Sequence, residues 1–397
     1  MVATRTTWIR ALGVATSSGL LSSLAAATAA APFQGPLTVD ATRAQPAQQS
    51  TAVLGSRALG PGTPPCNPRN RNECGSLLLF PELDNREGTR TIFTITDGCC
   101  TGGANVTVEV VYINKDTCQE RNAGLVLSPC DTVTWVSNQI IPDPMQGYAY
   151  AFARTSVPGG PGLFTPIVFN HLIGIETVVN GFDNFDYSIN AISFKGIGNE
   201  LATNDDDNDG IRDLNGPGAL GEYEEAPAQI VIPRFFGQDE FGSTAPQYDS
   251  DLILIALSGG ASFTTIARIT AFNDKGNQVD RTTPSFYCWE KRKLRDWVPN
   301  TVNSALDDPS NPTDDDANEP FGLVPRQAGW IVIDGVTASS TGPETIADPA
   351  LYAVLIERSN GGAAATLPFE VCSQTNGDLL PIGIFGDGPN PVSGDNQ

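Results

Sequence analysis

Short runs in which apolar and polar residues alternate restrict the fold of this chain more than any other feature. In Val106–Ile113 the valines alternate with Thr107 and Glu109, and in Gly147–Arg154 aromatic residues alternate with alanines. A period of two is typical of a β-strand, whose successive side chains point to opposite faces. Turn residues separate the runs, and long helical periodicity is almost absent. We therefore expect an all-β chain of antiparallel sandwiches.

The runs form two sets on either side of an acidic segment, so we expect two tandem antiparallel Ig-like β-sandwich domains joined by an acidic calcium-type loop. The expected organisation is a signal peptide at 1–29, a disordered Pro/Ala-rich leader at 30–65, a first sandwich at 66–200, an acidic calcium-loop linker at 201–226, a second sandwich at 227–374 and a flexible tail at 375–397.

The two sets repeat a series of features in the same order, which indicates a divergent internal repeat. Each has an apolar strand, then a strand that runs into an Asn-containing turn, then a cysteine, then a strand that starts with Gly and an aromatic residue. The corresponding pairs are Leu77–Phe80 with Leu252–Ile255, Asn114 with Asn273, Cys130 with Cys288, and Gly147-Tyr148 with Gly329-Trp330. The simpler alternative is that any two sandwiches share strands and turns.

The N-terminal residues read as an export signal. Arg5 and Arg10 precede an Ala/Leu-rich stretch, and Ala27-Thr28-Ala29 offers a small-x-small cleavage site. A membrane anchor is the alternative, but the apolar run is short and interrupted by serines, and no other segment is long enough to span a bilayer. We therefore expect an exported protein that is secreted, periplasmic or held at the cell surface, with no membrane insertion.

Cysteine usage agrees with export. An even number of cysteines in an oxidising compartment indicates disulfides. The eight cysteines are Cys66, Cys74, Cys99, Cys100, Cys118, Cys130, Cys288 and Cys372. The last two stand apart from the others, so we favour a bond between Cys288 and Cys372 and leave the pairing of the other six open. Zinc is the rival use, but the spacing is not that of paired CxxC motifs and no His is near.

Charge and composition exclude several classes of function. The chain has 45 Asp and Glu against 23 Lys and Arg, a formal net charge of −22. Such a chain should bind neither nucleic acid nor an anionic lipid surface. Its one histidine, His171, rules out HExxH zinc chemistry and limits a Ser-His-Asp triad to that residue. His171 has apolar neighbours, so we interpret it as a core or edge histidine.

The acidic segment carries the clearest candidate site. Asp205, Asp207 and Asp209 are spaced two apart, Gly210 follows, and Asp213 comes three residues later. This spacing can turn several carboxylates towards one cation, with the glycine allowing the sharp bend. The segment resembles the calcium loops of thrombospondin type 3 repeats, dockerins and EF-hands. That resemblance implies bound Ca²⁺ and a ligand carbonyl from Ile211.

The loop departs from those families at its last position. Gly216 stands where they place a bidentate acid, and Glu222, Glu224 or Glu225 could replace it; we take Glu222 as the candidate ligand. Bound Ca²⁺ would stiffen the junction between the domains. The alternative is a solvated acidic linker. A second acidic segment, Asp307–Glu319, has no glycine in register and is interpreted as solvated surface.

Lys291–Arg295 is the one basic patch in this acidic protein, and it lies between Trp289 and Trp297. Such a patch could bind an anionic polysaccharide or an acidic loop, of this chain or of a partner. We favour the alternative of a solvated stretch beside a core tryptophan. Trp135, Trp289 and Trp330 are all expected to fill sandwich cores rather than to form a sugar platform.

Three segments together give the chain a resemblance to uncharacterised exported β-sandwich proteins of planctomycete and Gram-negative type. They are Leu79–Arg86, Gly147–Ala153 and Asp207–Gly216. The resemblance implies export and this architecture, and no activity.

These observations favour a non-enzymatic structural, adhesive or binding protein of the cell envelope with a Ca²⁺-stabilised junction. Its expected partner is a protein or glycan at the cell surface, and self-association is left open. The alternative is a secreted polysaccharide-active hydrolase or a carbohydrate-binding protein. Glu109 and Glu176 are the acids that we name for a hydrolase, although the sequence does not pair them.

Overall fold

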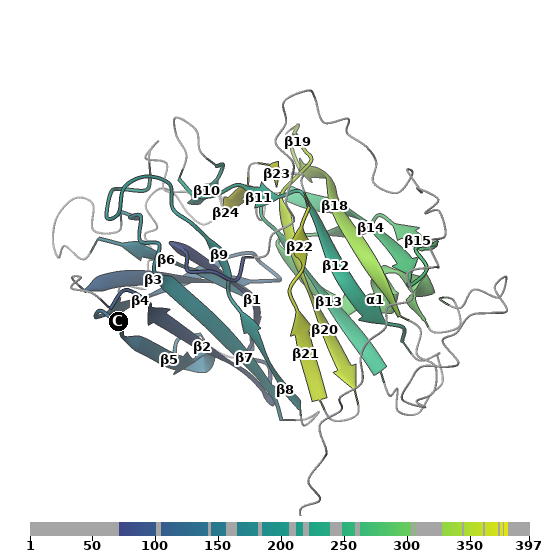
Figure 1. Cartoon of the computed structure of the whole chain (residues 1–397), viewed down its shortest axis with the longest axis horizontal. Coiled ribbons are helices and arrows are strands. Elements are labelled where there is room, and N and C mark those ends of the chain that lie inside the picture. The colour runs from purple at the N-terminus through teal and green to yellow at the C-terminus, as the bar shows by residue number, and fades with distance from the viewer. Residues whose placement is uncertain are drawn as a thin grey trace, which may run out of the picture. The chain divides into compact units, whose positions relative to one another are not determined.

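The computed structural model describes residues 71–100, 105–141, 144–155, 165–181, 185–205, 212–216, 222–238, 248–258, 263–302, 306, 328–343, 345–359, 362–371, 374–375 and 377–379. In this part of the chain nearly all regular structure is antiparallel β-sheet, as the sequence predicts (Figure 1). The helices whose bounds lie within the described residues are single turns: η1 (Ser137–Gln139), α1 (Leu294–Trp297) and η3 (Pro299–Thr301).

Two sheets form the first sandwich. The strands of the five-stranded sheet, in order, are β4 (Glu120–Leu127), β3 (Val106–Asn114), β6 (Gln146–Arg154), β1 (Leu77–Asp84) and β9 (Ile192–Phe194). Those of the four-stranded sheet are β5 (Thr132–Val136), β2 (Thr89–Asp97), β7 (Leu172–Asn180) and β8 (Phe185–Asn190).

The second sandwich repeats this plan. Its larger sheet runs in the order β15 (Gln278–Thr282), β14 (Phe263–Asn273), β18 (Ala328–Ser340), β12 (Gln229–Phe236) and β22 (Phe369–Glu370), with β16 (Ser285–Phe286) and β19 (Thr345–Ala347) on β14 and β18. The four-stranded sheet has the order β17 (Trp289–Lys293), β13 (Tyr248–Ala256), β20 (Leu351–Ser359) and β21 (Gly362–Thr366).

The strand orders confirm the internal repeat. Asn114 pairs with Gly147, and Asn273 pairs with Gly329 at the matching place in the second sandwich. The expected match of Leu77–Phe80 with Leu252–Ile255 is wrong, because β1 occupies the position of β12, not of β13. Both β1 and β12 shift register directly after a proline, Pro81 or Pro233, whose missing N–H interrupts the ladder.

Three apolar layers hold the sheets together. One lies inside the first sandwich and includes Phe80 and Phe93, and one lies inside the second and includes Leu252 and Leu254. The middle layer joins the five-stranded sheet of the first sandwich to the four-stranded sheet of the second, and it includes Tyr150 and Ile253. Strand β13 is therefore buried on both faces, which explains why its sequence is continuously apolar.

Residues Pro64–Gln397 form one compact unit, within which both sandwiches lie. The acidic segment and the chain beyond the second sandwich also pair with each other. Strand β10 (Arg212–Leu214) pairs with β24 (Gly377–Leu379), and β11 (Ala226–Pro227) pairs with β23 (Gln374–Thr375). The segment expected to be a flexible tail therefore begins with residues that are part of a small sheet. The rest of that segment, the signal peptide and the leader lie outside the described residues.

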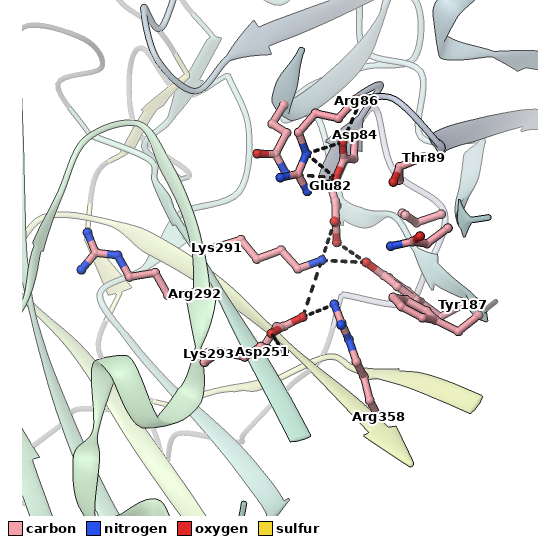
Figure 2. A pocket seen from close by; sticks show the side chains of 14 residues that line it. Glu82, Asp84, Arg86, Thr89, Tyr187, Asp251, Lys291, Arg292, Lys293 and Arg358 are labelled. Atoms are coloured by element: carbon pink, nitrogen blue, oxygen red, sulfur yellow. Dashed lines mark hydrogen bonds and ion pairs between the residues drawn. The ribbon is translucent and has the colours of Figure 1, made fainter. Parts of the chain in front are cut away.

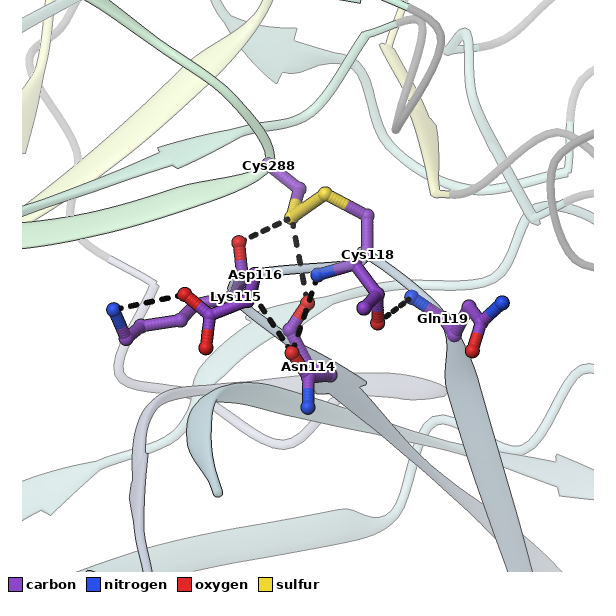
Figure 3. The surroundings of a disulfide bond; sticks show 7 residues. Asn114, Lys115, Asp116, Cys118, Gln119 and Cys288 are labelled. Atoms are coloured by element: carbon purple, nitrogen blue, oxygen red, sulfur yellow. Dashed lines mark hydrogen bonds and ion pairs between the residues drawn. A yellow bond between two sulfur atoms is a disulfide. The ribbon is translucent and has the colours of Figure 1, made fainter. Parts of the chain in front are cut away.

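The structure contains disulfides between Cys118 and Cys288 and between Cys100 and Cys130. The expected bond between Cys288 and Cys372 is therefore wrong. Cys288 is buried in the middle layer, where the turn that follows β3 brings Cys118 against it from the other sandwich (Figure 3). The sequence could not show this, because the two cysteines are 170 residues apart.

Two further cysteines of the described part, Cys74 and Cys99, are not in a disulfide. Cys66 and Cys372 lie outside the described residues. Disulfides are consistent with an oxidising compartment. Among the described residues, none belongs to a helix of the length and hydropathy needed to cross a membrane.

Candidate functional site

The candidate site begins at the irregularity in β1. Pro81 interrupts the ladder with β6, and the N–H of the next residue, Glu82, donates instead to Glu176 Oε1 at 2.9 Å. Both glutamates are fully buried. Burial, reinforced by the charge of Glu82, raises the pKa of the Glu176 carboxyl well above its ordinary value. Glu176 therefore stabilises the bulge from the neighbouring sheet.

The Glu82 carboxylate receives two donors. The Tyr187 hydroxyl donates to Oε2 at 2.5 Å, and the ammonium of Lys291, from the second sandwich, donates to Oε1 at 2.6 Å. Lys291 Nζ also lies 2.9 Å from the Tyr187 oxygen. Burial, followed by the charge of Glu82, raises the pKa of Tyr187 well above its ordinary value. Glu82, Tyr187 and Lys291 thus form a buried ionic contact between the sandwiches.

The alternation of β17 explains how the basic patch is divided. Trp289 packs in the middle layer and donates from Nε1 to the carbonyl of Pro81 at 2.8 Å. Lys291 lies on the same face, and its side chain is only 13% exposed. Arg292 points the other way, stacks 4.5 Å from the Trp297 ring and pairs with Glu290. The interpretation as a solvated stretch is therefore wrong for Lys291.

Asp251 on β13 is the second buried carboxylate of the site. It pairs with Arg358 on β20, and its Oδ1 lies 3.1 Å from Lys293 Nζ. Its Oδ2 lies 4.0 Å from Lys291 Nζ, which connects it to Glu82. The guanidinium of Arg358 stacks over the ring of Phe185, 4.4 Å from its centroid. The network thus extends across both sandwiches.

These groups line a cavity of about 290 Å³ (Figure 2). Four basic side chains face it, namely Arg86, Lys291, Lys293 and Arg358, and three carboxylates, namely Glu82, Asp84 and Asp251. Arg292 also lines the cavity, but its side chain points away towards Trp297 (Figure 2). The groups that face the cavity are therefore net positive by one charge, in a chain of net charge −22. Each of the five bases also has a carboxylate partner. Arg86, which forks onto Asp84, is the most exposed of them at 56%.

The acids that we named for a hydrolase lie elsewhere. Glu176 is buried behind the bulge and does not line the cavity. Glu109 is buried on β3 and pairs with Arg154 at 2.7 Å. His171 is 38% exposed at the start of β7, 3.6 Å from Glu200, which fits an edge histidine. Neither of the two acids lines this cavity.

Three of the expected calcium ligands, Asp205, Asp213 and Glu222, lie within the described part of the chain. The backbone N–H of Asp213 donates to Glu222 Oε2 at 3.1 Å, and Glu222 is only 1% exposed. Burial, with smaller contributions from the charges of Asp213 and Asp205, raises the pKa of Glu222 to about 8. These three acids therefore lie near one another. Asp207, Asp209 and Ile211 lie outside the described residues.

Of the other two candidate acids, Glu224 pairs with Arg71 at 2.9 Å. The backbone carbonyl of Glu225 accepts from the same guanidinium at 2.5 Å, while the Glu225 side chain lies against Gly216. Arg71 also pairs with Glu370 and lies 4.1 Å from the centroid of the Phe194 ring. It is a buried contact between the two sandwiches that the sequence analysis missed, because nothing in the local pattern distinguishes this arginine. Glu222 thus contacts the backbone of Asp213, and the Glu225 side chain lies beside Gly216 in the same segment.

Within the described residues, no group of three or more His, Cys, Asp or Glu side chains is arranged to hold a metal ion. The expectation that the three tryptophans fill sandwich cores is confirmed for two of them and wrong for the third. Trp135 and Trp289 lie in apolar layers, as expected. Trp330 belongs to none of the three layers; it stacks on Phe272 at a centroid distance of 4.2 Å, on the outer face of the larger sheet.

Comparisons with known proteins identify no family. No family model matches the chain, and no curated protein matches it. Among solved structures, the CBM22-1-CBM22-2 tandem domain of Paenibacillus barcinonensis Xyn10C matches at 9% identity and a TM-score of 0.14, covering 78% of this chain and 85% of that one. An infectious bursal disease virus structure (Gx strain) matches at 11% identity and a TM-score of 0.16, covering 84% and 82%. Similarities this weak carry no argument about function.

Proposed function

We propose that this chain is an exported, non-enzymatic structural or adhesive protein of the cell envelope, in which the two sandwiches act as one rigid body. The observation that carries the proposal is the middle apolar layer, which is closed by the Cys118–Cys288 bond. The contact between Lys291 and Glu82 and that between Arg71 and Glu370 lie across the same junction. A rigid connection suits a protein that transmits force or spaces its partners.

The charges of the cavity support a structural role over a hydrolytic one. Glycoside hydrolysis needs two carboxyl groups that face the substrate, one of them with a raised pKa. Glu82 and Asp251 face the cavity but are occupied by Lys291 and Arg358. Glu176, whose pKa is raised, does not reach it. The network is better suited to holding the sandwiches together.

Bound Ca²⁺ at the acidic segment is part of the proposal. The spacing of Asp205, Asp207, Asp209 and Asp213 supports it, and so does the position of Glu222. The Arg212 guanidinium offsets part of the cost of burying Glu222 beside Asp213 and Asp205, and a bound cation would compensate for more of it. Carboxylate and carbonyl oxygens are the ligands that Ca²⁺ prefers. The ion would tie the Asp205–Asp213 stretch to Glu222, which precedes β11.

Calorimetric titration and thermal unfolding test the calcium proposal. We expect stoichiometric binding to the wild-type chain, loss of binding in Asp207→Ala/Asp209→Ala, and a higher Tm in Ca²⁺ than in chelator. Asp314→Ala/Asp315→Ala, in the second acidic segment, is the matched control and should leave binding unchanged. If titration gave no heat and the Tm were the same in Ca²⁺ and in chelator, the calcium proposal would be contradicted. The segment would then be interpreted as a solvated linker.

A carbohydrate-binding function is the second candidate, favoured by the net positive cavity with Phe185 and Tyr187 in its lining. Its ligand would be an acidic sugar, placed by Arg86 and stacked on an aromatic ring. Incubation with a panel of acidic and neutral polysaccharides separates the functions. Binding of a polysaccharide to the protein without release of reducing ends supports a carbohydrate-binding function. Loss of that binding in Arg86→Ala would place the binding site at the cavity. Release of reducing ends would overturn the non-enzymatic proposal.

A further inference from the structure

The middle apolar layer joins two different kinds of face. One is the outer face of the five-stranded sheet of the first sandwich, and the other is the outer face of the four-stranded sheet of the second. Because the sandwiches share one topology, the chain carries one more face of each kind. These are the outer face of β5-β2-β7-β8, here called the Thr/Ile face, and the outer face of β15-β14-β18-β12-β22, here called the Trp face.

The Thr/Ile face consists mainly of apolar and hydroxyl side chains, with the charged residues Arg90 and Asp186 on either side of Val179. Its described side chains include Ile92, Thr94, Thr96, Thr132, Thr134, Ile173, Ile175, Thr177, Val179 and Ser188. Ile173, Ile175 and Val179 follow one another along β7 and are 45%, 36% and 37% exposed. They make up three of the seven large apolar side chains that are exposed in the described part of the chain. Contiguous exposure of this kind marks an interaction surface.

The hydroxyl groups of this face bond to one another across the strands. Thr94 pairs with Thr134 at 3.0 Å, and Thr96 pairs with Thr132 at 2.9 Å. Thr177 pairs with Ser188 at 2.8 Å. A hydroxyl that already has a hydrogen-bond partner loses less on leaving water than one without a partner. The face can therefore be covered at low desolvation cost.

The Trp face is equivalent by register to the first-sandwich face of the middle layer. Gly329 matches Gly147, so Trp330 stands at the position of Tyr148, which is buried in that layer. Trp330 stacks on Phe272, and Phe369, two strands from Trp330 on β22, is 39% exposed. The charged groups Arg268 and Asp334 on this face pair with each other at 3.1 Å. The Trp face is thus a more polar version of a surface that the chain already buries.

We propose that the Thr/Ile face of one copy packs on the Trp face of a second copy, repeating the contact that the two sandwiches make inside the chain. The inference rests on the proposed structural role and names its partner. The contact joins unlike faces, so each added copy leaves one free face at either end and the assembly grows as an open row. Asp334 stands at the position of Phe152, so this contact is weaker than the internal one.

Sedimentation at increasing protein concentration tests the proposal, in enough salt to screen the net charge of −22. The wild-type chain should form a concentration-dependent series of oligomers. Ile175→Glu and Phe369→Glu each place a charge on one face and should each be monomeric. Val126→Glu is the matched control, since Val126 is 56% exposed on β4 and lies on neither face. Far-UV circular dichroism and thermal melts verify that every variant is folded.

Mixing the two variants gives the decisive result. Ile175→Glu keeps an intact Trp face and Phe369→Glu keeps an intact Thr/Ile face, so an equimolar mixture should form dimers that do not grow further. A wild-type chain that stays monomeric up to millimolar concentration overturns the proposal, as does a mixture that stays monomeric. Either failure concerns the second copy alone, because the rigid-body role is tested by the disulfide variants described below.

Discussion

Lys291 of the second sandwich donates a hydrogen bond to the buried carboxylate of Glu82 in the first, over 2.6 Å. Glu82 is held in place by a bulge at Pro81, and Lys291 by the alternation of β17. A buried ion pair adds little net stability over apolar residues of similar size, but removing one partner leaves a charge without compensation. Any other placement of the sandwiches relative to each other would separate Lys291 from Glu82 and leave a buried charge without compensation, so the pair favours the observed placement.

Removal of one partner of this pair should be more damaging than removal of both. We expect Lys291→Met to lower the free energy of unfolding by about 3–5 kcal/mol, because Glu82 is left buried and charged. The double variant Glu82→Gln/Lys291→Met should recover much of that loss. Urea unfolding of the three proteins measures it, with the exposed Arg292→Met as the matched control. Equal losses in the single and double variants would contradict this reading.

The Cys118–Cys288 bond should stabilise the unit more than the shorter loop closed by Cys100–Cys130. Loss of a native disulfide costs about 2–5 kcal/mol, and in the chain-entropy model the longer loop contributes more. We expect Cys118→Ser/Cys288→Ser to unfold at lower urea and in two separate transitions. Cys100→Ser/Cys130→Ser is the control and should keep one transition. A single unchanged transition in the Cys118→Ser/Cys288→Ser protein would argue against the rigid-body role.

Acidic pH should stabilise the chain through Glu120. Burial, and then the charge of Glu109, raises the pKa of Glu120 from 4.5 to about 7. Between these values the folded chain keeps a proton that the unfolded chain has released, so this contribution to stability falls as pH rises. Urea unfolding at pH 5 and pH 8 should show the fall, and Glu120→Gln should reduce it. Glu87→Gln, on an exposed side chain, should not.

Alanine should destabilise the chain at Gly147 and Gly329, the second residues of β6 and β18. A Cβ on Gly147 would lie 1.8 Å from the carbonyl oxygen of Ile113, and one on Gly329 would lie 2.3 Å from that of Phe272. The backbone must shift in both cases, which we expect to cost about 1–3 kcal/mol, as overpacking does. Thermal melts measure it, with Gly342→Ala as the control, whose nearest contact is at 3.4 Å. If both alanine variants had the Tm of the wild type, the strands would not lie as close together at these glycines as the structure shows.

The sequence predicts where the strands lie along the chain, but it does not predict which distant segments pack against them. Alternation predicts β3 and β6, and the matching Asn and Gly residues predict the repeat, because both signals are local. The match of Leu77–Phe80 with Leu252–Ile255 was wrong. A continuously apolar run indicates that both faces of a strand are buried, but it does not show which sheets cover them. The partner of Cys288 and the role of Lys291 depend on the middle layer, which brings together segments that are far apart in the chain.

The position of the Cys118–Cys288 bond also determines how the chain would respond to tension. If the two ends were pulled apart, the 170-residue separation between these cysteines would be bridged by one covalent bond. At roughly 3.3–3.6 Å per residue, the bond withholds on the order of 600 Å of contour length from extension. In the oxidised protein, strands β4 to β16 would carry no load, whereas reduction would release that length. The same molecule would then resist extension under oxidising conditions and become extensible under reducing conditions.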